Sequence, residues 1–282
     1  MRPSQNLPFP FLTSKFGFCS TSWEYPNAAG IGCNALSPND TSNFLTFLQE
    51  LRDDPTGKDL ILSAATPVLP WKDENGSPST DVSGFASVLD FITVMNYDVW
   101  GSWDTAVGPN SPLNDTCAST ADQMGSAVSA VAAWTAAGMP AHQIVLGVAS
   151  YGHSYTVTPS NAIDKSGGDI GTLAAYPSFD KSSFPMGDGW DGPQGTDVCG
   201  NTDPNPSGNW DYWGLVQENW IFTNGTVQPG IEYRFDECSQ TVCLSISFLK
   251  SKLILSLSFK GLCIQRDIPN YGFLRRSACF QG

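Results

Sequence analysis

Apolar and polar positions along the first 150 residues follow two periods, one typical of strands and one typical of helices. Short apolar runs bounded by turn residues predict buried strands. We predict four such strands, at residues 16–24, 60–65, 89–98 and 144–149.

Two segments between these strands have apolar residues at helical spacing. The first is expected to begin at Asp40 or Thr41 and to end before Pro55. The second is an Ala-rich helix over residues 118–137, ended by Gly138. The apolar positions of the first helix are Phe44, Leu45, Phe47, Leu48 and Leu51.

Strands that alternate with helices at this spacing predict parallel βαβ units and an α/β fold. Polar or titratable side chains follow the predicted strands at their carboxyl ends, at Glu24, Tyr97, Asp98 and Tyr151. A (β/α)8 TIM barrel carries its active site at this edge. The pattern therefore predicts a partial TIM barrel with a candidate site formed by these residues.

The pattern changes twice after this region. Residues 155–241 are rich in Gly, Asp, Pro, Ser and Trp with little helical period, which indicates an α+β insertion lobe of loops and short strands. We therefore divide the chain into a partial catalytic barrel at residues 1–154, an insertion lobe at 155–241, and a divergent basic and apolar tail at 242–282.

The tail differs from the rest in charge and in pattern. It holds six of the 14 basic residues and one acid, whereas residues 1–241 hold eight basic and 26 acidic residues. Alternating apolar residues predict strands, and Lys250 and Lys252 interrupt the apolar run too early for a membrane span. The tail is interpreted either as a membrane or partner-binding segment or as a segment foreign to the domain. We favour the second, and expect the tail to pack loosely and its removal to leave thermal stability nearly unchanged.

Composition narrows the class of partner. Charged residues make up 15% of the 282 residues, and the net charge is −13. Binding a nucleic acid requires clustered Lys and Arg, so we exclude a nucleic-acid partner. A surface whose polarity comes from Ser, Thr, Asn and Gly is typical of secreted proteins that handle neutral sugars.

Cysteine and histidine content bears on compartment and cofactors. The eight cysteines form no CxxC pair, and only two histidines are present, so a zinc site has little support and we expect no metal or organic cofactor. The cysteines and four Asn-x-Ser/Thr sites fit an exported protein with disulfides. No signal peptide is evident, because Pro8 and Pro10 break the first apolar run. This mismatch predicts an incomplete chain.

Four motifs in chain order carry a resemblance to a known family. They are Ser22–Pro26 (SWEYP), Met95–Gly101 (MNYDVWG), Gly147–Gly152 (GVASYG) and Tyr233–Thr241 (YRFDECSQT). Together they resemble glycoside hydrolase family 18, the chitinases, in particular the fungal secreted members, over roughly residues 16–241.

The resemblance implies substrate-assisted, retaining hydrolysis of β-1,4-linked N-acetylglucosamine polymers. Glu24 would be the acid that protonates the glycosidic oxygen, and Tyr97 and Asp98 would hold the acetamido group. The resemblance further implies that the protein is an extracellular monomer that takes chitin or chitin oligosaccharides and needs no membrane. The residues expected to border the sugars are Trp23, Tyr25, Met95, Trp100, Trp103 and Tyr151.

The sequence departs from the family pattern Asp-x-x-Asp-x-Asp-x-Glu. Gly17, Ser20 and Ser22 occupy the three Asp positions, and His153 stands where the resemblance implies Arg. A serine carries no charge with which to stabilise a cationic intermediate, and loss of one preorganised group commonly costs about 10²–10³-fold in rate. No Trp after Trp220 supplies the expected floor of the sugar site.

Length agrees with these departures, since a whole barrel needs about 250 residues before insertions. We expect the first three strands and the eighth to be absent, which leaves an open sheet with unpaired edges. Three functional hypotheses stay open: an impaired chitinase, a non-catalytic chitin-binding lectin on the same scaffold, and a non-functional fragment.

Each candidate residue also has an ordinary structural interpretation. Glu24 could be a surface acid, and Tyr97 with Asp98 could be a polar strand end. Trp100 and Trp103 could pack in the core rather than against sugars.

Overall fold

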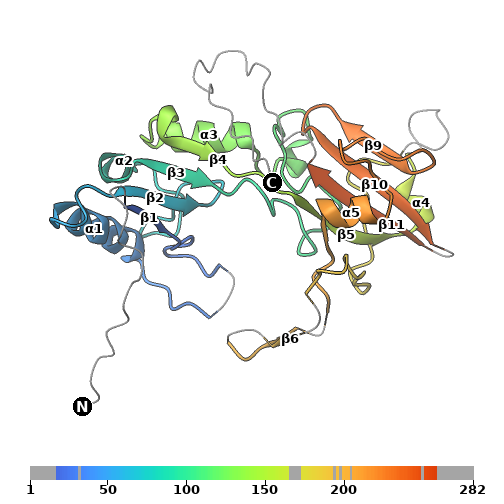
Figure 1. Cartoon of the computed structure of the whole chain (residues 1–282), viewed down its shortest axis with the longest axis horizontal. Helices are drawn as coiled ribbons and strands as arrows, with labels where there is room; N and C mark the ends of the chain where they lie inside the picture. Colours follow the sequence, from blue (N-terminus) through green and yellow to red (C-terminus); the bar gives the residue numbers. More distant parts are fainter. Residues whose placement is uncertain are drawn as a thin grey trace.

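The two larger β-sheets of the computed structural model lie side by side along the long axis of the molecule (Figure 1), and a third sheet consists of two short strands. A parallel sheet is built from the first half of the chain, and an antiparallel sheet from the second half. The structure describes residues 17–30, 33–164, 173–192, 195–196, 199–203, 205–248 and 251–258.

The parallel sheet confirms the four predicted strands. Its order is β1-β2-β3-β4, and every neighbouring pair is parallel. Among the described residues β1 and β4 form its two edges. The strands are β1 (Phe18–Thr21), β2 (Ile61–Thr66), β3 (Phe91–Val94) and β4 (Ile144–Leu146).

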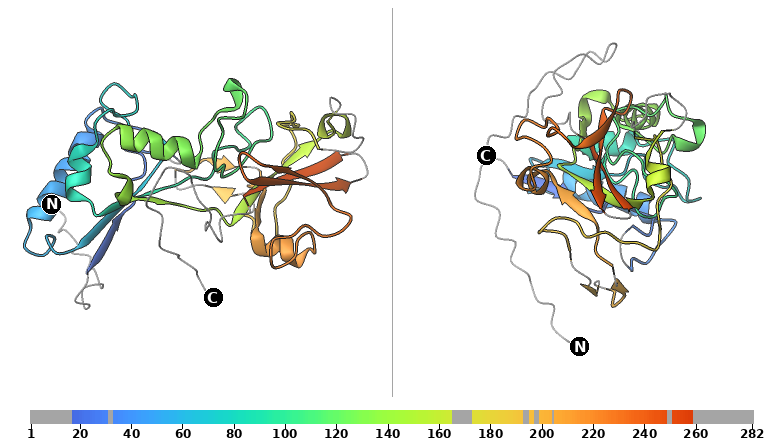
Figure 2. Two further views of the ribbon diagram at one scale, coloured as in Figure 1. Left: turned by 90° about the horizontal axis from the view of Figure 1, so that it is seen from above. Right: turned by 90° about the vertical axis from the view of Figure 1, so that its right-hand side faces the viewer.

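Three helices cover one face of this sheet (Figure 2). They are α1 (Asp40–Asp53), α2 (Ser83–Val88) and α3 (Ala127–Ala136). The core between helices and sheet is centred on Trp71, which packs against Phe85 at 4.5 Å and edge-on against Trp134 at 5.1 Å between ring centroids. Such aromatic packing contributes strongly to core stability.

The predicted first helix is confirmed, but the second was predicted too long. Residues 120–122 form only the 3₁₀ turn η1 (Thr120–Asp122), and α3 begins after Ser126. Gly125 has a φ of 127°, which breaks the helix, and Ser126 caps α3 by accepting a hydrogen bond from the amide of Ser129. Helix α2 was not predicted.

The antiparallel sheet has the order β8-β5-β11-β10-β9. Its strands are β5 (Tyr151–Val157), β8 (Asn209–Asp211), β9 (Glu232–Asp236), β10 (Thr241–Phe248) and β11 (Ser251–Ser258). The smaller elements are η2 (Ala141–Gln143), α4 (Pro159–Ala162), β6 (Gly195–Thr196), β7 (Thr202–Asp203) and α5 (Tyr212–Gln217).

The expectation of a loosely packed tail was wrong for the part that the structure describes. Strands β10 and β11 pair as a hairpin in the middle of the antiparallel sheet, flanked by β9 and β5. The side chain of Leu244 is 0% exposed, and Ile254 is also buried. The prediction that this segment forms strands is confirmed, and residues 259–282 lie outside the described residues.

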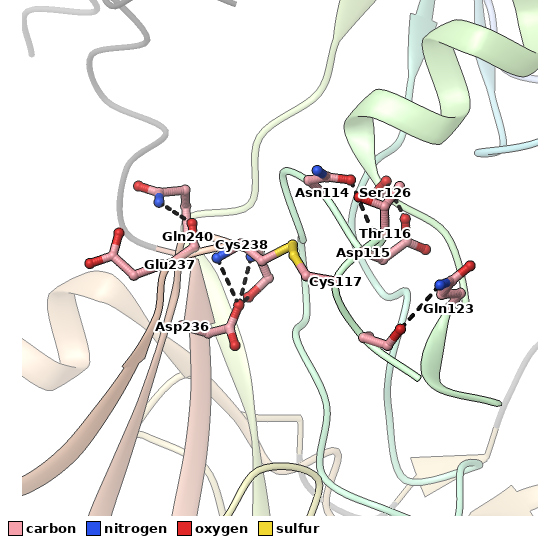
Figure 3. The surroundings of a disulfide bond; sticks show 12 residues. Asn114, Asp115, Thr116, Cys117, Gln123, Ser126, Asp236, Glu237, Cys238 and Gln240 are labelled. Atoms are coloured by element: carbon pink, nitrogen blue, oxygen red, sulfur yellow. Dashed lines mark hydrogen bonds between the residues drawn. A yellow bond between two sulfur atoms is a disulfide. The ribbon is translucent and has the colours of Figure 1, made fainter. Parts of the chain in front are cut away.

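Within the described residues, two disulfides connect segments that are distant in the sequence. Cys33 pairs with Cys199, and Cys117 pairs with Cys238, across Cα distances of 5.6 and 6.3 Å. The second bond joins the loop before α3 to the turn between β9 and β10 (Figure 3), and so ties the two sheets together. On one side of it, the Asp236 carboxylate accepts a hydrogen bond from the Cys238 amide at 3.1 Å.

The predicted boundaries between the parts of the chain stay a prediction. β5 spans the first of them, since it covers Tyr151–Val157 and pairs with β8 and β11 of the antiparallel sheet along its length. No helix among the described residues is both long and apolar enough to cross a membrane.

Candidate functional site

The candidate site lies where three chain segments leave the parallel sheet at its carboxyl edge. Glu24 follows β1, Tyr97 and Asp98 follow β3, and Tyr151 begins β5 after β4. Because all strands of a parallel sheet end at the same edge, these side chains are brought together.

Asp98 is the centre of a hydrogen-bond network. Its Oδ1 accepts a hydrogen bond from the Tyr151 hydroxyl at 2.6 Å and lies 2.9 Å from His153 Nε2. Its backbone is left-handed, with a φ of 55°, and its amide donates to Asn110 Oδ1 at 2.9 Å. Asn110 in turn donates to the Tyr151 carbonyl at 3.0 Å, so its side chain connects the backbone of Asp98 to that of Tyr151.

Burial and hydrogen bonding within this network shift the pKa values of Asp98 and Tyr151. Burial alone would raise the pKa of Asp98, but hydrogen bonds from His153 and Tyr151 and the attraction of His153 together lower it below its ordinary value. The pKa of Tyr151 is raised, first by burial and then by its hydrogen bond to Asp98, so its hydroxyl stays a donor. The other ring nitrogen of His153 lies 2.7 Å from Asn209 Oδ1 on β8.

Glu24 affects two tyrosines of the candidate site. Burial raises the pKa of Tyr25 to about 12, helped by the carboxylate of Glu24 beside it. Burial likewise raises the pKa of Tyr97, with smaller contributions from Glu24 and Asp98. The negative charges of Glu24 and Asp98 therefore contribute to the raised pKa values of Tyr25 and Tyr97.

The positions that the family pattern fills with aspartate are poor in charge here. Ser20 and Ser22 are exposed, and Gly17 uses its carbonyl to accept a hydrogen bond from the Ile61 amide at 2.9 Å. The Ser22 hydroxyl lies 3.5 Å from Glu24 Oε1, which is too long for more than a weak hydrogen bond. Glu24 therefore has no carboxylate two residues before it with which to share a proton.

A pocket of about 630 Å³ opens beside these residues, a volume suited to a small ligand. Four predicted site residues line it, namely Tyr25, Met95, Tyr97 and Asp98. The rest of the lining was not predicted from the sequence, and most of it comes from the loop after β2 and from the segment before α3. These missed residues are Pro67, Val68, Leu69, Val99, Asp115, Thr116, Gln123, Met124, Gly125 and Ser129.

The predicted aromatic sugar contacts divide into three kinds. Trp103 is 60% exposed and presents its ring beside His153, with centroids 5.9 Å apart. Trp23 is partly exposed but packs on Phe44 of α1. Trp100 is only 4% exposed and packs on Tyr176, so its ring offers no open face to a sugar.

No group of three or more potential metal ligands from His, Cys, Asp and Glu occurs among the described residues. One carboxyl group can give or take a proton at Glu24, and a rigid set of donors and acceptors surrounds Asp98.

Comparisons with known sequences agree with this arrangement. The sequence model of "Glycosyl hydrolases family 18" matches residues 20–240. A chitinase-like effector of Moniliophthora perniciosa is 51% identical over 219 residues, which cover 78% of this chain and 49% of that protein. A chitinase-like effector of Moniliophthora roreri is 51% identical over 220 residues, covering 78% of this chain and 52% of that protein. The chain spans about half the length of these curated relatives.

Solved structures support the fold. A chitinase from Rhizomucor miehei is similar with a TM-score of 0.71 and 35% identity, over 85% of this chain and 61% of that chain. A mutant of the class V chitinase from Nicotiana tobaccum, solved in complex with NAG4, has a TM-score of 0.55 and 20% identity, over 85% and 56% of the two chains. These neighbours imply a TIM-barrel-like fold, of which the described residues form four parallel strands.

Proposed function

The chain belongs to family 18 of the glycosyl hydrolases, and we propose that it is a chitinase-like protein that binds β-1,4-linked N-acetylglucosamine chains and hydrolyses them far more slowly than a complete chitinase. One observation carries the proposal. Ser20 and Ser22 stand where the family pattern has carboxylates before Glu24, whereas Asp98 keeps hydrogen bonds to Tyr151 and His153.

The expected chemistry explains why these serines matter. In substrate-assisted hydrolysis the acid protonates the glycosidic oxygen, and the carbonyl of the sugar's own N-acetyl group attacks the anomeric carbon. The resulting oxazolinium ion is positively charged, and a carboxylate at position 22 would stabilise it and hold the acetamido N–H. A neutral Ser22 supplies no such charge, and the loss of one such group costs about 10²–10³-fold in rate.

Binding does not depend on that charge. Asp98 can accept a hydrogen bond from the acetamido group or from a hydroxyl, and the rings of Tyr97 and Tyr25 offer apolar faces in the same pocket. A neutral sugar brings no charge of its own that would have to be desolvated on binding. The name "chitinase-like effector" of the two 51% identical relatives supports a role that is not digestion.

The same proposal includes the setting of the protein. We propose an extracellular monomer whose partner is chitin or its oligosaccharides, with no cofactor, no nucleic acid and no membrane. The two disulfides fit an oxidising compartment.

Binding is tested by calorimetric titration with the hexamer of N-acetylglucosamine. Asp98→Asn keeps the shape of the side chain but removes the charge that holds Tyr151 and His153, and we expect affinity to fall roughly tenfold. Asp53→Asn makes the same change at an exposed position of α1 and should leave affinity unchanged. Equal affinities in the three proteins would show that the ligand does not bind at Asp98.

Catalysis is tested separately by restoring carboxylates. Ser20→Asp together with Ser22→Asp should raise turnover, and adding Glu24→Gln to that double variant should abolish the gain because the amide cannot donate the proton. A folded double variant with no gain would place the defect elsewhere than in these two side chains.

A further inference from the structure

The four Asn-x-Ser/Thr sites of the sequence differ in their surroundings in the structure. An N-linked glycan is bulky and solvated, so the folded protein must leave the asparagine side chain open to solvent. Asn114 is half-buried, and the two residues after it line the pocket beside Asp98. Asn39 is exposed but stands directly before α1. The two sites in exposed turns are Asn75 and Asn224.

Asn224 is at the tip of a short hairpin that is anchored in the fold. Ile221 and Val227 form an antiparallel bridge at the base of the hairpin, and Ile221 is only 1% exposed. Near the tip, the Tyr212 hydroxyl of α5 donates a hydrogen bond to the Thr223 carbonyl at 3.0 Å. The hairpin is therefore held at its base by burial and near its tip by a hydrogen bond.

The loop has the geometry of a three-residue hairpin connection. The Phe222 amide donates to the Thr226 carbonyl at 2.8 Å, and the Gly225 amide donates to the Phe222 carbonyl at 2.9 Å. Gly225 has a φ of 82°, the left-handed conformation that such a loop needs at its last position. Successive cross-strand pairs point to opposite sides of a hairpin, and Ile221 is buried, so Phe222 and Thr226 point to solvent.

The side chain of Asn224 is turned toward this outward-pointing pair. Its Oδ1 accepts a hydrogen bond from the Thr226 amide at 3.0 Å, and Thr226 stands opposite Phe222. Asn224 and Thr226 are both exposed, and the side chain of Phe222 is exposed as well. A group attached to the Asn224 carboxamide therefore meets an apolar ring on the same side of the hairpin.

We propose that Asn224 carries an N-linked glycan and that the ring of Phe222 packs against its first sugar, an N-acetylglucosamine. The Asn224 Nδ2 forms a bond to the anomeric carbon of an oligosaccharide carried on a polyprenyl diphosphate. The bond from that carbon to the phosphate oxygen breaks, the polyprenyl diphosphate leaves with the electron pair, and the amide nitrogen loses one proton. The apolar C–H face of the attached sugar then covers the exposed ring of Phe222.

The inference rests on the extracellular setting of the proposed function, because this modification belongs to the secretory pathway. It does not depend on chitin binding. The pocket beside Asp98 is lined by residues between Tyr25 and Ser129, so a glycan at Asn224 is attached to a different part of the chain.

Asn75 is the matched comparison within the chain. It is also exposed in a tight turn, and Gly76 after it has a φ of 78°. Asp73 stands two residues before Asn75, at the place that Phe222 has before Asn224. The carboxylate of Asp73 accepts hydrogen bonds from the amides of Asn75 and Ser77 at 2.9 and 3.0 Å. A glycan at Asn75 therefore meets a carboxylate rather than a ring, and we expect it to add no stability.

The test starts with the full chain secreted from a eukaryotic expression host behind a secretion signal of that host. Peptide mass spectrometry should find a glycan at Asn224. The glycans are then trimmed enzymatically to the first sugar, and Asn224→Gln is made in the wild type and in Phe222→Ala. Asn224→Gln should lower the melting temperature by about 2–4 °C more in the wild type than in Phe222→Ala. This comparison cancels the hydrogen bond to the Thr226 amide, which Asn224→Gln disturbs in both backgrounds.

Two further variants separate the ring contact from a general effect of glycans. Phe222→Tyr should keep the full difference because it keeps a ring, and Asn75→Gln should change the melting temperature equally with and without Phe222. A secreted protein with an unmodified Asn224 refutes the site. An occupied Asn224 whose loss costs the same with and without the Phe222 ring refutes the contact. Hexamer binding is titrated on the same sample, so a glycosylated protein that does not bind would refute the proposed function and leave this inference standing.

Discussion

Truncation of Leu244 to alanine should destabilise the protein strongly, although this residue belongs to a segment whose sequence looks foreign to the domain. Leu244 is 0% exposed and sits on β10, with β11 on one side and β9 on the other. It packs with Leu215 and Ile221 in one cluster. Removing a fully buried leucine side chain leaves a cavity and costs about 3–5 kcal/mol in the free energy of unfolding.

The chain supplies a control in the same register. Tyr233 on β9 is directly opposite Leu244, but its ring is exposed, so Tyr233→Ala should cost no more than about 0.5 kcal/mol. Thermal unfolding followed by circular dichroism measures both, and Leu244→Ala should lower the melting temperature by roughly ten degrees. If the two variants melted together, β10 would not be part of the core, and the expectation of a loosely packed tail would be restored.

Three further predictions concern the site and its supports. The pKa of Asp98 is lower in the folded protein than the ordinary aspartate value of about 3.9, so the ionised Asp98 contributes stability above that pH and loses it as pH falls through the folded-state pKa. Melting curves at several pH values should therefore show that the wild type loses more stability below pH 4 than Asp98→Asn does. Replacing Cys117 and Cys238 by serine should cost about 2–4 kcal/mol in denaturant unfolding, and an unchanged midpoint would contradict this. Trp100→Ala should lower the melting temperature, whereas Trp103→Ala should spare it and weaken hexamer binding; the reverse pattern would reassign the two rings.

The elements that could be predicted from the sequence are those with a local signal. The apolar spacing of α1 and the four apolar runs of the parallel sheet were sufficient to predict these elements, because the spacing of apolar residues reflects which positions are buried. α2 is too short and lacks a side-chain cap, so it gave no such signal. The start of α3 depended on Gly125, whose amide is held by Asp115 from ten residues earlier.

The pairing of strands that are distant in the sequence could not be predicted. Alternation predicted strands at β10 and β11, but their place in the middle of a sheet depends on a register with β5 and β9 that no local pattern contains. This is why the tail was predicted to pack loosely.

In the candidate site, too, residues with a local sequence signal were predicted, whereas residues placed by tertiary structure were not. Tyr97, Asp98 and Tyr151 follow strands and were found from their position, whereas Asn110 and Asn209 reach the site from loops and from the second sheet. Pro67 to Leu69 follow β2 at the same edge, and that position was a signal that could have found them. Exposure of individual tryptophans depends on tertiary packing, so Trp100 and Trp103 could not be told apart.

Product analysis under saturated binding tests most directly whether this protein binds chitin oligosaccharides with little hydrolysis. The wild-type protein is titrated with the N-acetylglucosamine hexamer, the bound sample is incubated, and the sugars are separated by chromatography. We predict saturable binding and recovery of nearly all of the hexamer intact, because Ser20 and Ser22 cannot stabilise the cationic intermediate. Conversion to shorter sugars at an ordinary enzymatic rate of about 1 s⁻¹ or more would contradict it, as would a hexamer that does not bind.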